Sequence, residues 1–196
     1  MKNNNFAQKI TNDEIAQLPL TQFPGEIIVI DTYEKLHKFV PILKKEKILG
    51  FDTETRPSFK KGKMHKMSLL QLSTLNTAFL IRLNKIGFPN QIAEILSDKE
   101  IIIIGLAIND DIKGLQKQNY FEPESFIDLQ KIVHNYDIEN KALKKIFGIV
   151  LGKRISKSQQ LSNWEADELS KAQKSYAATD AWACIEIYKE LRNTQF

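Results

Sequence analysis

The segment Ile48-Leu-Gly-Phe-Asp-Thr-Glu-Thr55 combines an apolar run, a glycine and two carboxylates, Asp52 and Glu54. Side chains alternate between the two faces of a strand, so this spacing places Asp52 and Glu54 on the same face. Thr53 and its apolar neighbours take the other face. Two like charges on one face repel each other unless the face is wet or a cation lies between them. The segment alone therefore leaves two interpretations open, a polar sheet edge and a metal site.

The composition places this segment in an ordinary globular chain. The 196 residues are enough for one domain with a sizeable core, and 42% are hydrophobic and 27% charged. The net charge of +4 permits a polyanionic partner without requiring one. The single cysteine, Cys184, excludes an internal disulfide, and it is too little for a zinc site together with three scattered histidines. Neither a signal sequence nor an apolar span is visible, so we expect a cytoplasmic protein that does not enter a membrane.

The hydrophobic pattern around the segment predicts alternating strands and helices. Residues 1–25 read as an N-terminal extension and residues 26–196 as the domain. We expect strands at 26–30, 48–54, 67–73, 78–83, 101–104 and 126–127, and helices near 32–45, 89–96, 108–118, 128–134, 139–148 and 169–192. Short connections between the strands at 48–54, 67–73 and 78–83 indicate an antiparallel meander, and the run Ile101–Ile104 is typical of a central parallel strand. These features predict an α/β fold with a mixed sheet, antiparallel first and then parallel, flanked by helices.

A third carboxylate is expected at the start of the helix after the isoleucine strand. Acidic residues are common at a helix N-terminus, because they complement its free N–H groups and its dipole. Helical spacing separates the two aspartates here. Asp111 lies three residues after Ile108 and four before Leu115, on the apolar face, whereas Asp110 shares its face with Lys113. Asp111 is therefore the candidate that points inward, and Asp110 is expected to face solvent.

A fourth carboxylate interrupts the apolar stripe of the last helix. The segment Ser170–Gln173 resembles a capping box that starts this helix. Asp180 falls within the stripe, one turn after Tyr176. A buried carboxylate without a partner is unfavourable, so either an ion pair with a basic residue or a metal is needed to keep it there. The Tyr176 hydroxyl is expected to reach the same place.

The four carboxylates Asp52, Glu54, Asp111 and Asp180 are expected to converge. At about 4 Å, and with an effective dielectric constant near 20, each like-charge pair costs roughly 4 kcal/mol. Several such pairs rival the whole stability of a domain, about 5–15 kcal/mol, so the cluster must bind protons or cations. Oxygen ligands favour Mg²⁺ or Mn²⁺ over zinc, and two such ions about 3.5–4 Å apart are a common arrangement for phosphodiester cleavage.

Three segments resemble, in order and spacing, the motifs of the DEDD superfamily of exonucleases, in the subclass with tyrosine in the third motif. They are Phe51-Asp-Thr-Glu54, Gly105 to Asp111, and Tyr176-Ala-Ala-Thr-Asp180. Gly62-Lys63 and Leu161-Ser-Asn-Trp164 add a similarity to the Werner-type exonuclease domains of that superfamily. The resemblance covers about residues 26 to 192. It implies a ribonuclease H-like fold and removal of nucleotides from a 3′ end as nucleoside 5′-monophosphates.

The resemblance also implies two divalent cations, Mg²⁺ or Mn²⁺, and a role for each site residue. Asp52 would bridge both ions. Glu54 and Asp180 would hold the ion that activates water, and Asp111 would act through the second ion or its waters. Tyr176, helped by Glu54, would orient the attacking water.

Contacts with nucleic acid are predicted from weaker features, each with a structural alternative. Thr53 and Thr55 are candidates for the terminal nucleotide by analogy, although hydroxyls at a strand end are common. The candidates for phosphate contacts are Lys60, Lys61, Lys63, Lys66, Lys153, Arg154 and Lys157, all of which fit solvated lysines and arginines equally well. Trp164 is a candidate for stacking on a base, and packing of the last helix onto the sheet is its alternative.

The leading function is a 3′–5′ exonuclease that acts on the free 3′ end of DNA. One alternative is RNA trimming in the manner of ribonuclease D, and another is an inactive nucleic-acid-binding scaffold. The presence of all four acidic residues and the tyrosine argues against the inactive scaffold. The sequence ends shortly after the last helix, without room for the extra helical domains of ribonuclease D, and this favours DNA. A helicase or polymerase partner is expected only in trans.

Overall fold

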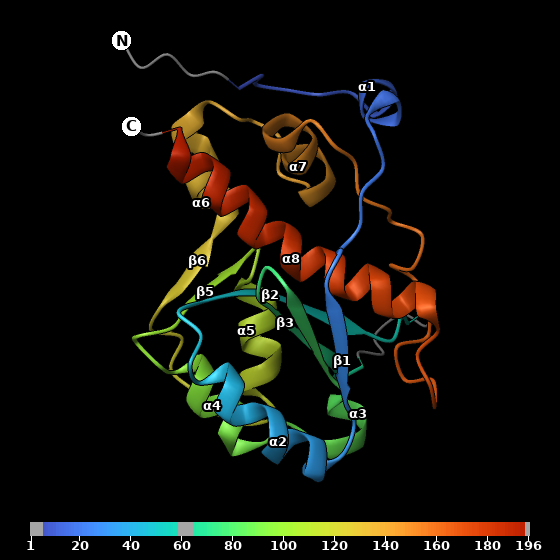
Figure 1. Ribbon diagram of the computed structural model, residues 1–196, viewed down its shortest axis with the longest axis vertical. Coiled ribbons are helices and arrows are strands. Elements are labelled where there is room, and N and C mark those ends of the chain that lie inside the picture. Colours follow the sequence, from blue (N-terminus) through green and yellow to red (C-terminus); the bar gives the residue numbers. More distant parts are fainter. Residues whose placement is uncertain (1–5, 59–64, 195–196) are drawn as a thin grey trace.

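The computed structural model describes residues 6–58 and 65–194, and these residues form one mixed sheet flanked by helices (Figure 1). The strands are β1 (Glu26–Ile30), β2 (Ile48–Thr55), β3 (Met67–Ser73), β4 (Thr77–Ile81), β5 (Ile102–Gly105) and β6 (Phe126–Asp128). Their order in the sheet is β1-β4-β3-β2-β5-β6. The pairs β2–β3 and β3–β4 are antiparallel, while β1–β4, β2–β5 and β5–β6 are parallel. The predicted mixed sheet, with its antiparallel meander and central isoleucine strand, is confirmed.

The helices follow the predicted pattern with shifted ends. They are α1 (Asn12–Gln17), α2 (Tyr33–Leu43), α3 (Leu83–Ile86), α4 (Asn90–Leu96), α5 (Asn109–Gln116), α6 (Leu129–Val133), α7 (Leu143–Leu151) and α8 (Lys171–Asn193), with a 3₁₀ turn at His134–Tyr136. The sequence pattern missed α1 and α3. The strand predicted at 78–83 ends at Ile81, because Leu83 already begins α3, and the helix predicted at 139–148 begins only at Leu143.

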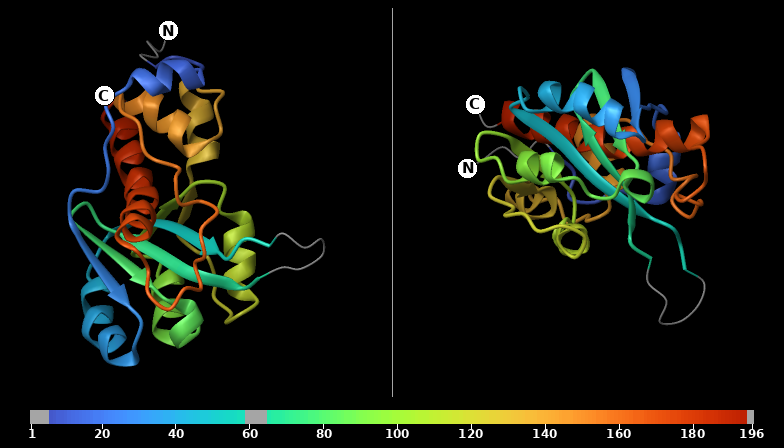
Figure 2. Two further views of the ribbon diagram at one scale, coloured as in Figure 1. Left: turned by 90° about the vertical axis from the view of Figure 1, so that its right-hand side faces the viewer. Right: turned by 90° about the horizontal axis from the view of Figure 1, so that it is seen from below.

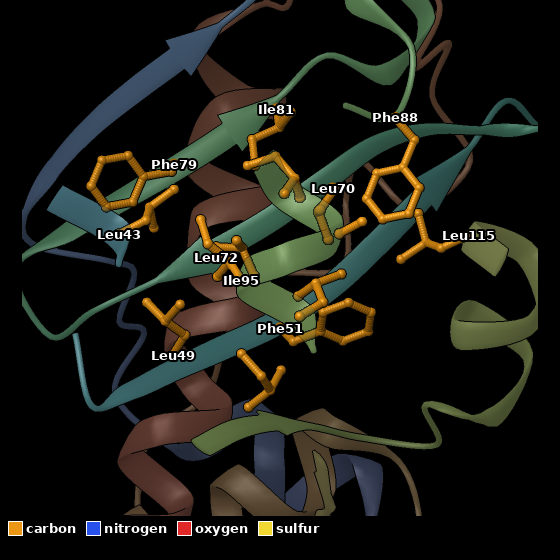
Figure 3. Packing of buried hydrophobic residues seen from close by; sticks show 14 of the residues in the cluster. Leu43, Leu49, Phe51, Leu70, Leu72, Phe79, Ile81, Phe88, Ile95 and Leu115 are labelled. Atoms are coloured by element: carbon orange, nitrogen blue, oxygen red, sulfur yellow. The ribbon is translucent and has the colours of Figure 1, made fainter. Parts of the chain in front are cut away.

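Each face of the sheet packs against a different set of helices. On one face, β2, β3 and β4 pack with α2, α3 and α4, and Figure 3 shows this layer, with α8 behind the strands. The other face is covered by α8, and α6 and α7 pack against α8 (Figure 2). Strand alternation assigns Phe51 to the first face and Asp52 to the second. The carboxylates of β2 are therefore directed toward α8.

Helix α8 lies directly on β2 at a glycine. A Cβ atom added to Gly50 would lie 2.0 Å from the carbonyl oxygen of Ala181. Gly50 has no side chain and Ala181 has a small one, so the two backbones can approach each other closely. This contact sets how close Asp180, the neighbour of Ala181, comes to Asp52.

The N-terminal segment wraps onto the helical face. Leu20 forms a parallel bridge with Arg154, and the backbone N–H of Phe23 donates to the Thr179 hydroxyl at 3.0 Å. Ile15 and Phe23 are both buried. The division into an extension and a domain stays a prediction. Within the two described ranges, no helix combines the length and the hydropathy needed to cross a membrane.

Candidate active site

Three of the predicted carboxylates meet in space. Strand β2 supplies Asp52 and Glu54, and helix α8 supplies Asp180. One carboxylate oxygen from each residue lies within 4.8 Å of those of the other two. The alternation predicted for the strand is confirmed by the register, in which Asp52 is opposite Gln71 and Glu54 is opposite Leu69. Two residues adjacent on one strand face and one residue from the covering helix therefore form a single acidic cluster.

The start of α8 determines where Tyr176 and Asp180 lie. Ser170 and Gln173 form the predicted capping box, with the Gln173 N–H donating to the Ser170 hydroxyl at 3.2 Å. The Gln173 amide also donates to the carbonyl of Asn163 at 3.1 Å, which fastens the preceding loop to the helix. One turn further, the hydroxyl of Tyr176 hydrogen-bonds to Asp180. Tyr176 is 7% exposed and Asp180 8%, so this pair is almost fully removed from water.

Burial and mutual repulsion raise the pKa values of the cluster. Burial first, and then the charges of Asp180 and Asp111, raise the pKa of Asp52 well above its ordinary value. Burial and the charge of Asp52 raise the pKa of Glu54 to about 10. Burial raises the pKa of Asp180 to about 7, although the hydrogen bond from Tyr176 lowers it. Burial also raises the pKa of Tyr176, so its hydroxyl stays protonated and can donate.

This cluster fits a hard divalent cation. All three groups are carboxylates, which are the ligands that Mg²⁺ and Mn²⁺ prefer. In the absence of a cation the site retains protons, as the raised pKa values show. A bound cation supplies the positive charge that these protons otherwise provide.

The raised pKa values predict an inverted pH dependence of stability in the metal-free protein. The folded state holds protons that the unfolded chain releases above its ordinary carboxyl values of 3.8 and 4.5, so the unfolded state binds fewer protons. We expect the melting temperature in EDTA to fall as the pH rises from the unfolded values through about 7 for Asp180 and toward about 10 for Glu54. Saturating Mn²⁺ should raise the melting temperature, most strongly at high pH, because it binds the ionised cluster. Thermal denaturation at a series of pH values checks this, and equal melting in Mn²⁺ and EDTA at pH 8 would contradict a metal site.

The fourth carboxylate, Asp111, lies beside the cluster rather than inside it. It extends from α5 and accepts a hydrogen bond from the Thr53 hydroxyl, on the strand face opposite Asp52. Its charge still raises the pKa values of Asp52 and Glu54, so it is close to both. The expectation that all four carboxylates form one cluster is therefore met by three of them. Asp110 is exposed, as predicted.

A pocket of about 290 Å³ opens over the carboxylates, and Lys157 lines it together with Tyr176. The positive charge of Lys157 lowers the pKa of Asp180. Among the predicted phosphate contacts that the structure describes, Lys157 is the one that lines this pocket. Lys153 is exposed, and the Arg154 guanidinium donates to the carbonyl of Leu18 at 2.9 Å, so it anchors the N-terminal segment. The role of Arg154 as a nucleic-acid contact stays a prediction.

The remaining predicted contacts are placed elsewhere or lie outside the described residues. The Thr53 hydroxyl is engaged by Asp111, and Thr55 follows a bulge in β2 and lines a separate groove of about 690 Å³ beside α5. Lys66 lines the same groove. Lys60, Lys61 and Lys63 lie outside the described residues.

Trp164 is not available for stacking on a base. Its side chain is 0% exposed and packs with Leu69, Leu80 and Tyr176, whose ring centroid lies 6.0 Å from that of the indole. The stacking prediction is wrong, and the packing alternative describes the residue. The loop had too little sequence pattern to show which way the indole points.

Sequence reasoning also missed the residues that hold this loop in place. The Arg82 side chain is buried and donates to the carbonyls of Ala166 and Asp167. Glu165 accepts from Arg56 at 3.3 Å and lies 3.5 Å from His65. Arginine after a strand and glutamate in a loop are both common, and the sequence contains no further signal for these contacts.

The mixed sheet and its buried acidic cluster define a class of protein. The fold is that of the ribonuclease H-like exonucleases, with the carboxylates at the junction of a strand and the covering helix. A family model described as 3′-5′ exonuclease, named for the A-type DNA polymerases, matches residues 27–195. The chain belongs to this 3′-5′ exonuclease family of the DEDD superfamily, and it is an enzyme domain of that type.

Individual relatives agree with this assignment. The chain is 31% identical over 188 residues to the mouse bifunctional 3′-5′ exonuclease/ATP-dependent helicase WRN, covering 90% of this chain and 13% of that protein. The crystal structure of the Nibbler EXO domain of Aedes aegypti is similar with a TM-score of 0.79 and 24% identity, covering 89% of this chain and 92% of that one. Ribonuclease D of Trypanosoma brucei in complex with RNA U12 is similar with a TM-score of 0.76 and 21% identity, covering 86% of this chain and 63% of that one. The chain spans less than half the length of the first curated relatives it matches.

Proposed function

We propose that this protein is a metal-dependent 3′–5′ exonuclease of the tyrosine subclass that hydrolyses the terminal phosphodiester of DNA and releases nucleoside 5′-monophosphates. One observation carries the proposal. The carboxylates of Asp52, Glu54 and Asp180 lie within 4.8 Å of one another, in an open pocket that Tyr176 also lines. Such a cluster is unstable without counter-charge, and its oxygen ligands suit two Mg²⁺ or Mn²⁺ ions.

Each residue of the site has a part in the proposed reaction. Two divalent cations, when bound, neutralise charge on the phosphate and help to generate the nucleophile. Asp52, Glu54 and Asp180 would hold these cations. Asp111, which accepts a hydrogen bond from Thr53 beside the cluster, would act through the second cation or its waters. Tyr176 keeps its proton and is hydrogen-bonded to Asp180, so its hydroxyl can orient the attacking water.

DNA is the proposed substrate, and RNA is the second candidate. The match to the family named for A-type DNA polymerases supports DNA. RNA is the second candidate because a ribonuclease D with the same fold, 21% identical to this chain, was crystallised with RNA. An inactive scaffold is a third possibility, against which the complete set of acidic residues argues. A cytoplasmic location, and a helicase or polymerase partner acting in trans, stay predictions.

Digestion of labelled substrates tests the function. We expect 5′-labelled DNA to shorten stepwise in Mg²⁺ or Mn²⁺, 3′-labelled DNA to lose its label first as a mononucleotide, and EDTA to stop both. Matched single-stranded and recessed-duplex DNA and RNA, at equal 3′-end concentration, separate the two substrate classes by kcat/KM. Faster digestion of RNA would replace the DNA assignment, and absence of digestion on every substrate would contradict the enzymatic proposal.

Lys157 is expected to contribute to binding of the phosphate at this site. Its ammonium group is the positive charge that acts on Asp180 within the pocket, and it is well placed to neutralise an incoming phosphate. Lys157→Ala should lower kcat/KM by about tenfold, with a weaker dependence on salt concentration, because one cation–phosphate contact is lost. Lys157→Arg should retain most of the activity. Lys153→Ala is the matched control, since Lys153 is exposed four residues earlier. Equal losses in the Lys157→Ala and Lys153→Ala proteins would show a general effect of surface charge.

A further inference from the structure

One buried side chain near the site has no visible use. Gln71 of β3 is 0% exposed, and neither its amide nitrogen nor its carbonyl oxygen has a hydrogen-bond partner among the described residues. A buried amide without hydrogen-bond partners is unfavourable, because the hydrogen bonds that it makes to water in the unfolded chain are not replaced. Groups of this kind in native proteins usually have a partner or a role in the site beside them. A hydrophobic side chain of similar size at this position would make the folded protein more stable, unless the amide has a function.

The sheet register places Gln71 next to the acidic cluster. Gln71 is the residue directly opposite Asp52 in the antiparallel β2–β3 pair, so both side chains are on the α8 face. Residues paired in this way have Cβ atoms about 4.5–5.5 Å apart, which is within reach of a glutamine amide. The Gln71 N–H₂ group is a donor without an acceptor, and the Asp52 carboxylate is an acceptor whose charge is opposed by burial.

A second unpaired atom lies on the other side of Gln71. The indole nitrogen of Trp164 is fully buried and has no acceptor within the described part of the chain. Trp164 packs on Leu69 and Leu80, which are the residue two before Gln71 on β3 and the residue opposite Gln71 on β4. The indole thus covers both apolar neighbours of Gln71 on the same face. Its N–H is a donor without an acceptor, and the Gln71 carbonyl is an acceptor without a donor.

We propose that Gln71 is a positioning residue that links Trp164 to Asp52. Neither hydrogen bond is formed at the side-chain positions that the structure describes, so the link requires a rotation of the Gln71 side chain. After that rotation the Trp164 indole N–H donates to the Gln71 carbonyl oxygen, and the Gln71 amide donates to the Asp52 carboxylate. The link satisfies the three unpaired atoms at once and holds one oxygen of Asp52 so that the other is directed into the cluster. Removal of a residue that hydrogen-bonds to a metal ligand and orients it typically lowers the metal affinity by about 10–100-fold. The metal-binding half of this inference rests on the proposed function.

The arrangement also gives a reason for burying Trp164 beside Tyr176. The loop that carries Trp164 is fastened by Gln173 of α8 and by Arg82, so the indole is held on a rigid support. Its orientation is then transmitted through Gln71 to Asp52. The same loop contacts the ring of Tyr176, so both Asp52 and Tyr176 are positioned from one place.

Gln71→Met tests the link, with Leu69→Met as the matched control. Methionine keeps the approximate volume of glutamine and removes both hydrogen-bonding groups. Leu69 is equally buried, on the same strand and face, opposite Glu54. We expect Gln71→Met to raise the Mn²⁺ concentration that half-saturates the thermal shift by about 10–100-fold. Leu69→Met should leave it within about twofold of the wild-type value, because volume-conserving swaps in a core are well tolerated. Wild-type Mn²⁺ affinity in the Gln71→Met protein, together with normal wild-type activity, would overturn the proposal.

A spectroscopic measurement in EDTA tests the other half of the link without any metal. The chain has two tryptophans, Trp164 and Trp182, so the Trp182→Phe variant shows which indole N–H resonance belongs to Trp164. We expect the Trp164 indole proton to be downfield and protected from exchange in the wild-type protein. Gln71→Met should move it upfield and increase its exchange, whereas Leu69→Met, which removes no hydrogen-bonding group, should leave its exchange unchanged. An unprotected wild-type indole, or one unaffected by Gln71→Met, would overturn the link even if the variant folds poorly. A wild-type protein that neither binds Mn²⁺ nor digests nucleic acid would instead overturn the proposed function and the Asp52 half of the link.

Discussion

Replacement of Asp52 by asparagine is expected to abolish exonuclease activity and, in EDTA, to raise the melting temperature. Asp52 lies at the centre of the acidic cluster, where burial and the charges of Asp180 and Asp111 raise its pKa. An amide of the same shape cannot ionise, so folding in EDTA no longer requires this position to stay protonated above its ordinary pKa, and the free energy of unfolding rises. The same change removes a ligand of the proposed cations, and loss of a single electrostatic group typically lowers kcat by about 10²–10³-fold or more. Activity on labelled DNA and thermal denaturation in EDTA measure the two effects on one preparation.

Asp110→Asn is the matched control for this experiment. Asp110 is exposed and lies next to Asp111 in α5, so its replacement changes the net charge equally without entering the cluster. We expect its activity and melting temperature to stay close to those of the wild-type protein. An Asp52→Asn protein that digests DNA normally in Mg²⁺ would show that the cluster is not the catalytic site. A lower melting temperature of the Asp52→Asn protein in EDTA would show that the negative charges of the cluster are already compensated in the metal-free protein.

Gly50→Ala is expected to be strongly destabilising and to lower activity at the same time. The added Cβ atom would lie 2.0 Å from the carbonyl oxygen of Ala181, and both partners belong to the backbones of buried elements. Neither backbone can move without disturbing the packing around it. We therefore expect the free energy of unfolding to fall by about 3 kcal/mol, near the upper end of the range for overpacked cores. Moving α8 away from β2 also separates Asp180 from Asp52, which lowers activity in the folded fraction. Urea unfolding and activity per folded molecule are the two measurements.

Gly114→Ala separates this steric effect from the general effect of adding a methyl group to a glycine. The nearest atom to a Cβ at Gly114 is the terminal methyl of Met67, at 2.3 Å, which is the free end of a flexible side chain. Because Gly114 lies within α5, alanine also gains helix propensity worth about 1 kcal/mol. We expect stability equal to or slightly above that of the wild-type protein. Similar losses in the Gly50→Ala and Gly114→Ala proteins would mean that the added methyl group itself, and not the contact of β2 with α8, causes the loss of stability.

The pattern of the chain was sufficient to predict most of the sheet. Alternation in residues 48–55 and the isoleucine run at 101–104 report local side-chain placement, which depends on neighbours in sequence. The pattern missed α1 and α3 because both are short, at six and four residues, and carry little periodicity. Such helices form because the chain around them is already positioned by packing.

The sequence by itself determined which groups make the site, because strand and helix periodicity show which face each side chain takes. It placed Asp52 with Glu54, put Asp180 within the buried stripe of its helix one turn after Tyr176, and separated Asp111 from Asp110. Only the tertiary structure decided how these groups meet. The close contact of Gly50 with Ala181 brings Asp180 to the two carboxylates of β2, while Thr53 holds Asp111 beside the cluster. Distances between segments far apart in the chain depend on packing, and no local spacing encodes them.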